Sequence, residues 1–389
     1  MFDVEKNVKS SVFLLIIIII GIFGNLLNII VFSHKSMRKN ATFKYLLYLS
    51  IIDLLVLLVC ATDACLIQGA FIIIRSFSNL TCKLHTFLTY FLTHLSSIVL
   101  MEVNLERALN ICHDSIAKIN SFKNIAAIIK SIANLLENVS KAIPATLAIV
   151  FVFNSHFLMM LQTTKEETLS SNMLNTQTGT SSTIDSPKHK LINRIKHRIR
   201  NNNESMTTKS ITVKMENDEP LMCYPAKNES YYYFLTNIWI WLDALVYSLI
   251  PFVIMIVCSI IILYDIRKKS SRFIQTNKKS LFLTNREMAR KSKKRNRQLL
   301  TMLVFNDFYF ILCSLPVCLY MIYYKFNYQK DENLTTKSFF HLLAYTNNAF
   351  NFVFYLIFSQ KYRQVWSSWI FNIKRKNRID GNHVEISNE

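Results

Sequence analysis

Glycine and proline are scarce in this chain, which has only five glycines and six prolines among its 389 residues. No glycine lies in a G-x-G-x-x-G or Walker-type loop, whose backbone N–H groups would hold a phosphate. The histidines form no H-E-x-x-H pattern and the cysteines no C-x-x-C pattern, so the ligand spacing of a zinc site is also missing. We therefore expect neither nucleotide-dependent nor metal-dependent catalysis, and we predict that the protein is not an enzyme.

Apolar and charged residues are both abundant, because 51% of the chain is hydrophobic while the formal net charge is +20. Such a chain must separate apolar from charged segments along its length, as membrane proteins do. A helix needs about 20 mostly apolar residues to span a bilayer. Seven segments meet this requirement: 11–32, 45–74, 82–111, 142–161, 234–264, 299–324 and 338–358. The sequence therefore predicts an all-α bundle of seven transmembrane helices (residues 11–358) in contact with lipid.

The lysines and arginines set the expected orientation, because basic residues in short loops favour the cytoplasm. Residues 265–298 are strongly basic and should lie inside. Residues 1–10 should then be extracellular, and residues 372–389 should form a cytoplasmic tail at the plasma membrane. The first span follows two lysines and could be a signal peptide, but its length and basic far flank favour an uncleaved anchor. The fourth span is weakly apolar, yet omitting it would place the basic loop outside.

The outer side should carry a long loop, residues 162–233, which is polar and rich in Ser, Thr and Asn. We expect most of it to be disordered. Its basic segment 188–200 is either an interfacial helix or a solvated run of charge. Sequons at the expected outer side support the topology, although two others, at Asn40 and Asn138, fall inside and such tripeptides also arise by chance. The outer sequons are at Asn79, Asn203, Asn228 and Asn333.

Only two of the eight cysteines, Cys82 and Cys223, fall on the outer side of this topology. The other six lie within spans or at their inner ends. Because the cell exterior is oxidising, we expect a Cys82–Cys223 disulfide that joins the third span to the long outer loop.

Short patterns in five of the spans occur in the order and at the membrane depth of one receptor family. They are Leu49-Ser50-Ile51-Ile52-Asp53, Glu106-Arg107-Ala108, Pro251, the segment FILCSLP that ends at Pro316, and Asn351-Phe352-Val353-Phe354-Tyr355. Arg107 follows Cys82 by the family's 25 residues. After the last span, residues 359–371 resemble a short amphipathic eighth helix on the inner membrane surface. Across all seven spans the chain resembles the rhodopsin-like (class A) G-protein-coupled receptors, and within them the peptide-receptor type.

The resemblance implies a heterotrimeric G protein as partner and a set of activation residues. These are Glu106, Arg107, Pro251, Pro316, Asn351 and Tyr355. Arg107 would pair with Glu106 in the idle state and face the partner when helices move, whereas simple snorkelling at the membrane edge is the alternative. Ser314 stands where the family has tryptophan and Phe352 where it has proline. High constitutive activity, altered switching and loss of signalling all stay open.

A carboxylate inside a spanning helix is costly, so Asp53 should face a polar cavity or bind a cation. The resemblance implies that Asp53, Ser96, Asn347 and Asn351 converge on Na⁺ and water, with Asn25 beside them. The alternative is a hydrogen-bonded packing network without sodium. No other metal or cofactor is expected.

The resemblance disfavours an amine ligand, because Thr89 lies where an amine receptor has its ion-pairing acid, and Tyr345 replaces the retinal lysine of opsins. The outer halves of the spans suggest an aromatic and polar pocket, lined by Asp63, Thr89, Tyr90, Thr93, Asp243, Tyr320 and His341. Asp63 and Asp243 have no evident basic partner in their spans, so we expect a short cationic neuropeptide as ligand. Protonation, or pairing with a lysine at a helix end, is the alternative.

Other function classes fit the sequence less well. A secondary transporter usually has inverted repeats, and the two halves of this chain show no similarity. A divergent chemosensory receptor would share every pattern named above. No nucleic-acid partner is predicted, since the basic residues flank apolar spans.

Overall fold

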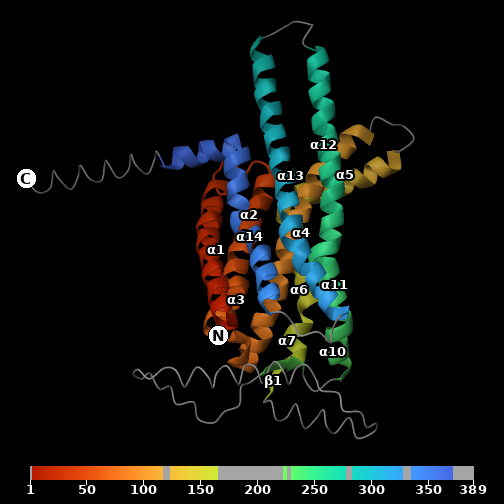
Figure 1. Ribbon diagram of the computed structural model, residues 1–389. Coiled ribbons are helices and arrows are strands. Elements are labelled where there is room, and N and C mark those ends of the chain that lie inside the picture. The colour runs from red at the N-terminus through yellow and green to blue at the C-terminus, as the bar shows by residue number, and fades with distance from the viewer. Residues whose placement is uncertain are drawn as a thin grey trace, which may run out of the picture.

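The fold is that of the computed structural model, which describes residues 2–116, 123–164, 222–225, 229–276, 283–326 and 334–370 (Figure 1). Three of the outer sequons, at Asn203, Asn228 and Asn333, lie outside the described residues. So do the basic segment 188–200, residues 372–389, most of the outer loop and part of the basic inner loop.

The described residues form long helices that run side by side (Figure 1). Along the chain they are α1 (Phe2–Phe32), α2 (Ala41–Val56), η1 (Leu57–Ala61), α3 (Thr62–Ala70), η2 (Ile74–Ser76), α4 (Asn79–Ile116), α5 (Lys123–Glu137), α6 (Val139–Asn154), α7 (His156–Met160), β1 (Leu161–Thr164), β2 (Met222–Pro225), α10 (Glu229–Tyr233), η4 (Phe234–Trp239), α11 (Ile240–Ala244), η5 (Leu245–Leu249), α12 (Ile250–Thr276), α13 (Leu283–Phe326) and α14 (Leu334–Phe358). Residues 360–370 form one more helix.

All seven predicted spans are helical. Six helical segments of the described chain are long and apolar enough to cross a membrane: Lys9–Phe32, Ala41–Ala70, Asn79–Cys112, Val139–Met160, Glu229–Lys268 and Arg297–Phe326. The seventh predicted span corresponds to α14, which packs against α1 and α13 inside the bundle. Three asparagines and one histidine make α14 less apolar than a typical span, and two of the asparagines, Asn348 and Asn351, belong to the polar cluster described below.

The helix ends differ from the predicted limits of the spans. The second span ends earlier, at Ala70, where Phe71 adopts a left-handed conformation with φ of 57°. The fourth breaks at Ser155, between α6 and α7. Helices α12 and α13 run on into the segment 265–298 that we predicted as a loop. Turn residues and charges in the sequence are poor markers of where such a helix ends, because a helix can continue into water once its apolar part is anchored in the bundle.

Helix α5 and strands β1 and β2 were not predicted. Helix α5 lies in the inner connection between the third and fourth spans, and its residue Leu136 accepts a hydrogen bond from the Tyr45 hydroxyl (2.8 Å). Strands β1 and β2 pair antiparallel, with Thr163 opposite Cys223, and add one short two-stranded sheet to the predicted all-α bundle. Cys223 is bonded to Cys82 at the start of α4, as expected, and this disulfide holds β2 beside the bundle.

The two ends of the bundle have different characters. The N-terminus and β1 lie at one end, which we call the outer end after the predicted orientation (Figure 1). Helix α5 and the helix 360–370 lie at the other, the inner end, where the long α12 and α13 project (Figure 1). The helix 360–370 is fixed to the bundle through Tyr362, whose hydroxyl donates to Asn28 Oδ1 (2.7 Å). Burial raises the pKa of the Tyr362 phenol, so the donor proton stays in place.

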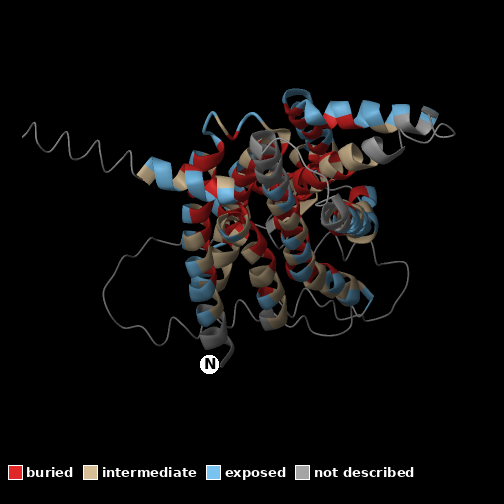
Figure 2. Cartoon of the chain, turned by 90° about the horizontal axis from the view of Figure 1, so that it is seen from above, coloured by how far each residue is buried: buried red, intermediate tan, exposed pale blue. Residues whose placement is uncertain are grey.

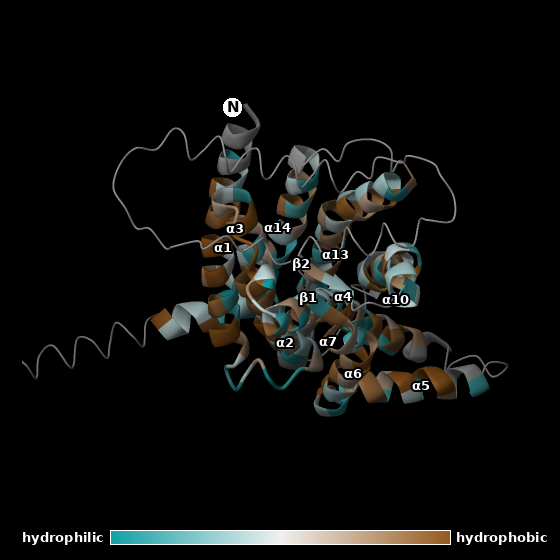
Figure 3. Ribbon diagram, turned by 90° about the horizontal axis from the view of Figure 1, so that it is seen from below, coloured by the Kyte–Doolittle hydropathy of each residue, from teal (hydrophilic) through white to brown (hydrophobic). Residues whose placement is uncertain are grey.

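The surface of the bundle between its ends is apolar. Buried residues line the interior and exposed ones the outside (Figure 2), and hydrophobic residues cover the outer faces of α1 and α6 (Figure 3). On α1, for example, the side chains of Phe13 and Phe23 are each 61% exposed. An apolar band of this kind on a multi-pass helical protein is the surface that lipid covers.

Gly24 and Phe352 form a close contact between α1 and α14. A Cβ atom added at Gly24 would overlap the Phe352 ring. Phe352 occupies the position that in the family is proline, so the aromatic ring extends into space that only glycine leaves open. The same contact brings α1 close to the asparagines of α14, where Asn25 Nδ2 donates to the Asn348 carbonyl (2.9 Å).

We predict that Gly24→Ala lowers the thermal stability of the protein in detergent, because overpacking costs about 1–3 kcal/mol. A second change, Phe352→Leu, should restore most of the loss by removing the overlapping ring atoms. Gly69→Ala is the matched control, because there the added methyl meets only the Ser11 side chain. Equal melting temperatures for Gly24→Ala and Gly69→Ala would contradict the packing argument.

Candidate functional site

Asp53 is fully buried and forms the centre of a polar cluster in the middle of the bundle. Its Oδ1 atom accepts hydrogen bonds from the Ser96 hydroxyl of α4 and from Asn348 Nδ2 of α14, both at 2.7 Å. Its Oδ2 atom accepts from Asn351 Nδ2, also at 2.7 Å. The carboxyl group therefore joins α2, α4 and α14, and three donors compensate its removal from water.

The cluster differs from the predicted set at one position, because Asn348 and not Asn347 donates to Asp53. Asn347 lies one turn before Asn351 on α14, and its Oδ1 atom is buried without a hydrogen-bond partner. The Oδ1 atom of Asn351 is in the same situation. Amide oxygens without partners, one of them on the Asn351 side chain that binds Asp53, are hard oxygen donors of the kind that a small cation prefers, so the residues present fit a Na⁺ ion.

Arg107 lies at the inner part of α4 and binds the start of α2. Its Nε atom is 3.2 Å from Glu106 Oε2, and the guanidinium also donates to Asn40 Oδ1 and Thr42 Oγ1. Glu106 is buried and accepts further hydrogen bonds from Thr42 (3.3 Å) and Asn110 (2.9 Å). The expected Glu106–Arg107 pair is therefore present, and the link to the Asn40 cap of α2 was not foreseen.

The other predicted activation residues surround this region. Tyr355 is buried against Phe32 and Tyr362, and its hydroxyl has no hydrogen-bond partner. Pro316 lies inside α13, and Pro251 directly follows the π-helical turn η5. Such π turns and prolines interrupt the regular hydrogen bonds of a helix and are the usual places where it bends.

In the outer half, Asp63 is not the unpaired acid that we expected. Its Oδ2 atom binds Arg75 of η2 at 3.1 Å, and its Oδ1 atom is 3.9 Å from His85 Nε2. Arg75 lies in the connection after the second span. The sequence did not indicate that this connection lies near Asp63, so the pair was not predicted. The cost of this buried carboxylate is already offset within the chain.

Asp243 also has a partner, because its Oδ1 atom lies 2.9 Å from Nε2 of the fully buried His94. The other ring nitrogen of His94 faces Asn154 Oδ1 at 3.2 Å. Tyr90 and Trp239 pack beside this group, with ring centroids 5.6 Å apart. Of the predicted pocket residues, Tyr90 and Asp243 therefore come together around His94, between α4 and α11.

The other predicted pocket residues make contacts that differ from those around His94. The hydroxyls of Thr89 and Thr93 donate to the carbonyls of their own helix, His85 and Thr89 respectively. Tyr320 packs on Phe340 with ring centroids 5.3 Å apart, and His341 is half-buried. The two threonines therefore use their donor protons inside α4 and contribute mainly shape to any pocket there.

Comparison with known proteins finds a match to one family model. The family model for the 7 transmembrane receptor (rhodopsin family) matches residues 204–355. The match covers the helices from α10 to α14 with Pro251, Pro316, Asn351 and Tyr355 in place. Over these residues the chain is similar to the rhodopsin family of seven-transmembrane receptors. A search of the curated proteins found no match.

Asp307 is a buried acid that the sequence analysis missed, although the reason for selecting Asp53, a carboxylate inside a spanning helix, applies to it as well. Asp307 of α13 is 2% exposed. It accepts hydrogen bonds from Asn104 Nδ2 of α4 (2.6 Å) and from the Ser259 hydroxyl of α12 (2.7 Å). This carboxyl group ties the sixth span to the third and fifth on the inner side of Pro316.

We predict that Asp307→Ala destabilises the receptor, because it leaves the Asn104 and Ser259 donors unsatisfied at a cost of about 1–3 kcal/mol each. Asp307→Asn keeps the shape and an acceptor oxygen, so its melting temperature should stay closer to that of the wild type. Thermal unfolding of the purified receptor measures both. The network would have no role in stability if the two variants melted at the wild-type temperature.

Proposed function

We propose that this receptor transmits the binding of an extracellular ligand to nucleotide exchange on a heterotrimeric G protein, with its N-terminus outside the cell. The observation that carries the proposal is the arrangement of Arg107. A charged side chain at the inner part of α4 is held by Glu106 and by the cap of α2, through contacts that a modest helix shift would break. Helix shifts of this size are the usual way in which a packed bundle switches.

Three polar groups would have to rearrange for the inner end of the bundle to open. They are the Arg107 contacts, the Asp53 cluster and the Asp307 contacts. Each group joins α4 to another span, so α4 is the common element. A ligand that favours one arrangement at the outer ends of α4 and α11 would shift the balance at the inner end. The inner ends of α4, α12 and α13, with residues 265–298 and the helix 360–370, form the proposed docking face.

The first test requires no ligand. Glu106→Gln weakens the ion pair and should raise basal nucleotide exchange several-fold, whereas Arg107→Ala should abolish exchange while surface expression is kept. Arg38→Ala, a change at an exposed inner-loop arginine, is the control. Exchange on purified G protein and cell-surface labelling are measured in parallel. If Arg107→Ala is expressed normally and its nucleotide exchange is unchanged, Arg107 is only a snorkelling residue at the membrane edge.

We further propose that Na⁺ binds beside Asp53 and stabilises the closed arrangement. The support is the set of oxygen atoms already described: one carboxyl group and two buried amide oxygens without partners. A cation held between α2, α4 and α14 favours the state that keeps these helices together. An agonist that favours the other state should therefore lower the affinity for Na⁺, and Na⁺ should lower the affinity for the agonist by the same factor.

Thermal unfolding gives a test that does not depend on activity. Replacing N-methylglucamine by Na⁺ at constant ionic strength should raise the melting temperature of the wild type, because ligand binding stabilises the folded state. Asp53→Asn should remove this dependence, and Asp307→Asn should keep it. If the wild type melts at the same temperature with either cation, the residues around Asp53 form a packing network that does not bind Na⁺.

The ligand that we propose is a short cationic neuropeptide that contacts Asp243. Asp63 and Asp243 both have partners within the chain, and they differ in exposure. The Asp243 side chain is 36% exposed and can meet a ligand, whereas that of Asp63 is 4% exposed. Tyr90 and Trp239 beside Asp243 could add cation–π attraction.

A library of short cationic peptides would supply an agonist for the test. Asp243→Asn should then lower its potency about tenfold or more, since a charge-assisted hydrogen bond contributes about 1.5–3 kcal/mol. Asp63→Asn, at the acid paired with Arg75, should change potency less. A best agonist without a positive group, or equal potency on both variants, would refute the proposal for this ligand class while leaving the receptor function intact.

A further inference from the structure

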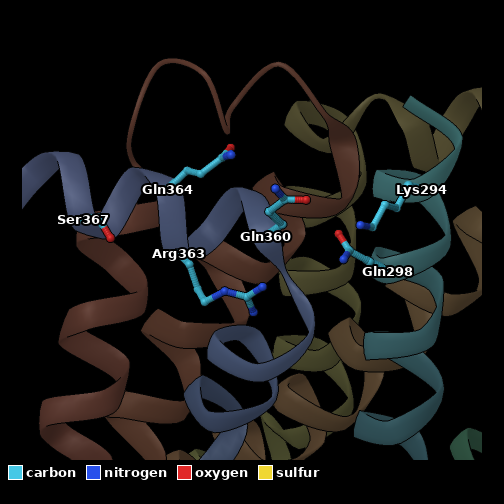
Figure 4. Close-up of a pocket in the computed structure, with 6 residues that line it drawn as sticks. All are labelled: Lys294, Gln298, Gln360, Arg363, Gln364 and Ser367. Atoms are coloured by element: carbon cyan, nitrogen blue, oxygen red, sulfur yellow. The ribbon is translucent and has the colours of Figure 1, made fainter. Parts of the chain in front are cut away.

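The two ends of the bundle present different surfaces. At the inner end a polar cleft of 580 Å³ lies between α13 and the helix 360–370, with Lys294 and Arg363 among its lining residues (Figure 4). At the outer end the connection from α3 to α4, with the first turns of α4, exposes large apolar side chains instead. We call these residues the outer apolar patch: Phe71, Ile72, Ile73, Phe77, Leu80 and Leu84.

The outer apolar patch is held at the surface of the bundle. Phe77 and Leu80 are 64% and 70% exposed. The connection that carries them is fixed at two points, because Arg75 of η2 binds Asp63 Oδ2 (3.1 Å) and the disulfide joins Cys82 to β2. A group of large exposed apolar side chains marks contact with another molecule or with a membrane.

Phe71 has a backbone conformation that is unfavourable for an aromatic residue. It ends α3 with φ of 57° and ψ of 25°, and it is the one non-glycine residue of the described chain with a positive φ. Helix ends of this kind usually carry glycine, because a β-carbon is strained there. A phenylalanine at such a position indicates that its side chain has a role beyond folding.

The depth of the patch is set by its neighbours on α1. The Ser11 hydroxyl donates to the Cys65 carbonyl (3.2 Å), and a Cβ atom added at Gly69 would meet the Ser11 side chain. Ser11 lies two residues after Lys9, where the first apolar span begins. The span that contains α4 begins at Asn79, next to Leu80. Both ends of the connection therefore lie where the apolar spans begin, at the boundary between lipid and water.

The patch also continues a surface that lipid covers. The second span carries exposed apolar side chains at helical spacing, Ile51, Leu55 and Leu58, and ends at Ala70, where the patch begins. The side chains of Val12 and Phe13 on α1, beside the end of α3, are exposed as well. No change from apolar to polar surface separates these side chains from Phe71.

The outer loop of the chain has a composition that is poorly suited to cover the patch. Residues 165–221 contain no phenylalanine, tyrosine or tryptophan and are mostly polar. Large apolar side chains are stabilised by contact with apolar groups rather than with water or polar groups. The acyl chains of the neighbouring lipid supply such groups at the depth of the patch.

We propose that the outer apolar patch inserts into the outer leaflet of the bilayer and anchors the outer ends of α3 and α4 there. Phe and Leu side chains of interfacial segments reach about 5–10 Å into the boundary between headgroups and acyl chains. The connection from α3 to α4 is then part of the membrane anchor rather than a loop in water. This proposal is independent of the ligand and of G-protein coupling.

Photocrosslinking identifies the neighbour of the patch directly. The photoreactive amino acid p-benzoylphenylalanine is incorporated at Phe77 of the full-length protein in cell membranes, and mass spectrometry identifies the adducts after irradiation. Phe13 on α1 is the lipid-facing control, and Glu229, exposed and charged at the start of α10, is the polar control. We expect phospholipid adducts at Phe77 in an amount comparable to Phe13 and several-fold above Glu229.

Other neighbours would overturn the proposal. A crosslink from Phe77 to residues 165–221 would show that the outer loop covers the patch. A crosslinked dimer would assign the patch to a second copy of the chain, and a crosslink to a different protein would assign it to a protein partner. If Phe13 yields lipid adducts and Phe77 yields no adduct, the patch lies in water.

The sequon at Asn79 gives a second test, because it lies between Phe77 and Leu80. A glycan is bulky and polar and needs water around its asparagine. We therefore expect no glycan at Asn79 in the wild type, and partial modification in Phe77→Ser with Leu80→Ser, which keeps the sequon and removes two apolar side chains. Glycopeptide mass spectrometry measures both.

The matched control is Val12→Ser with Phe13→Ser, which removes two exposed apolar side chains from α1 and should leave Asn79 unmodified. Surface expression is measured for each variant, so that only folded protein is compared. A wild-type protein that carries a glycan at Asn79 in most copies would overturn the proposal, because residues 77–80 would then lie in water.

Discussion

The charge of the Asp53 carboxyl group has to be compensated in the interior of the bundle, and much of the bundle is arranged around this requirement. Its partners come from α4 and α14, elements that lie far from α2 in sequence, so the bundle must close before the hydrogen bonds can form. An unsatisfied group in lipid is costly, which makes the three-helix arrangement specific. Asn25 extends the same cluster to α1 through the Asn348 carbonyl.

The same principle recurs at the inner side with different residues. Asp307 joins α13 to α4 and α12, and Glu106 joins α4 to α2 together with Arg107. Polar contacts of this kind are well suited to a switch, since each has a definite geometry and can be exchanged for another. The apolar contacts between them, such as the Phe352 ring on Gly24, fix the spacing of the helices within which the exchange takes place.

The two departures from the family pattern have different consequences. Phe352 removes a helix breaker, and α14 runs without interruption from Leu334 to Phe358. Glycine on α1 accommodates the larger side chain, so the change is absorbed by packing. Ser314 is fully buried in α13 where an aromatic pivot would stand. The Asp307 contacts, lower in the same helix, give α13 a polar attachment to α4 and α12.

The sequence alone located the apolar helical segments and gave their order, because a helix that crosses a membrane needs a long apolar run of a definite length. It also determined the Cys82–Cys223 pair, since topology left no other outer cysteines. Only the tertiary structure decided which side chains meet. Asn347 and Asn348 are adjacent in sequence but point about 100° apart on a helix, so the rotation of α14 selects Asn348. Arg75 and His94 became partners of the two outer acids because the packing of distant segments brought them there, and no local pattern encodes such a contact.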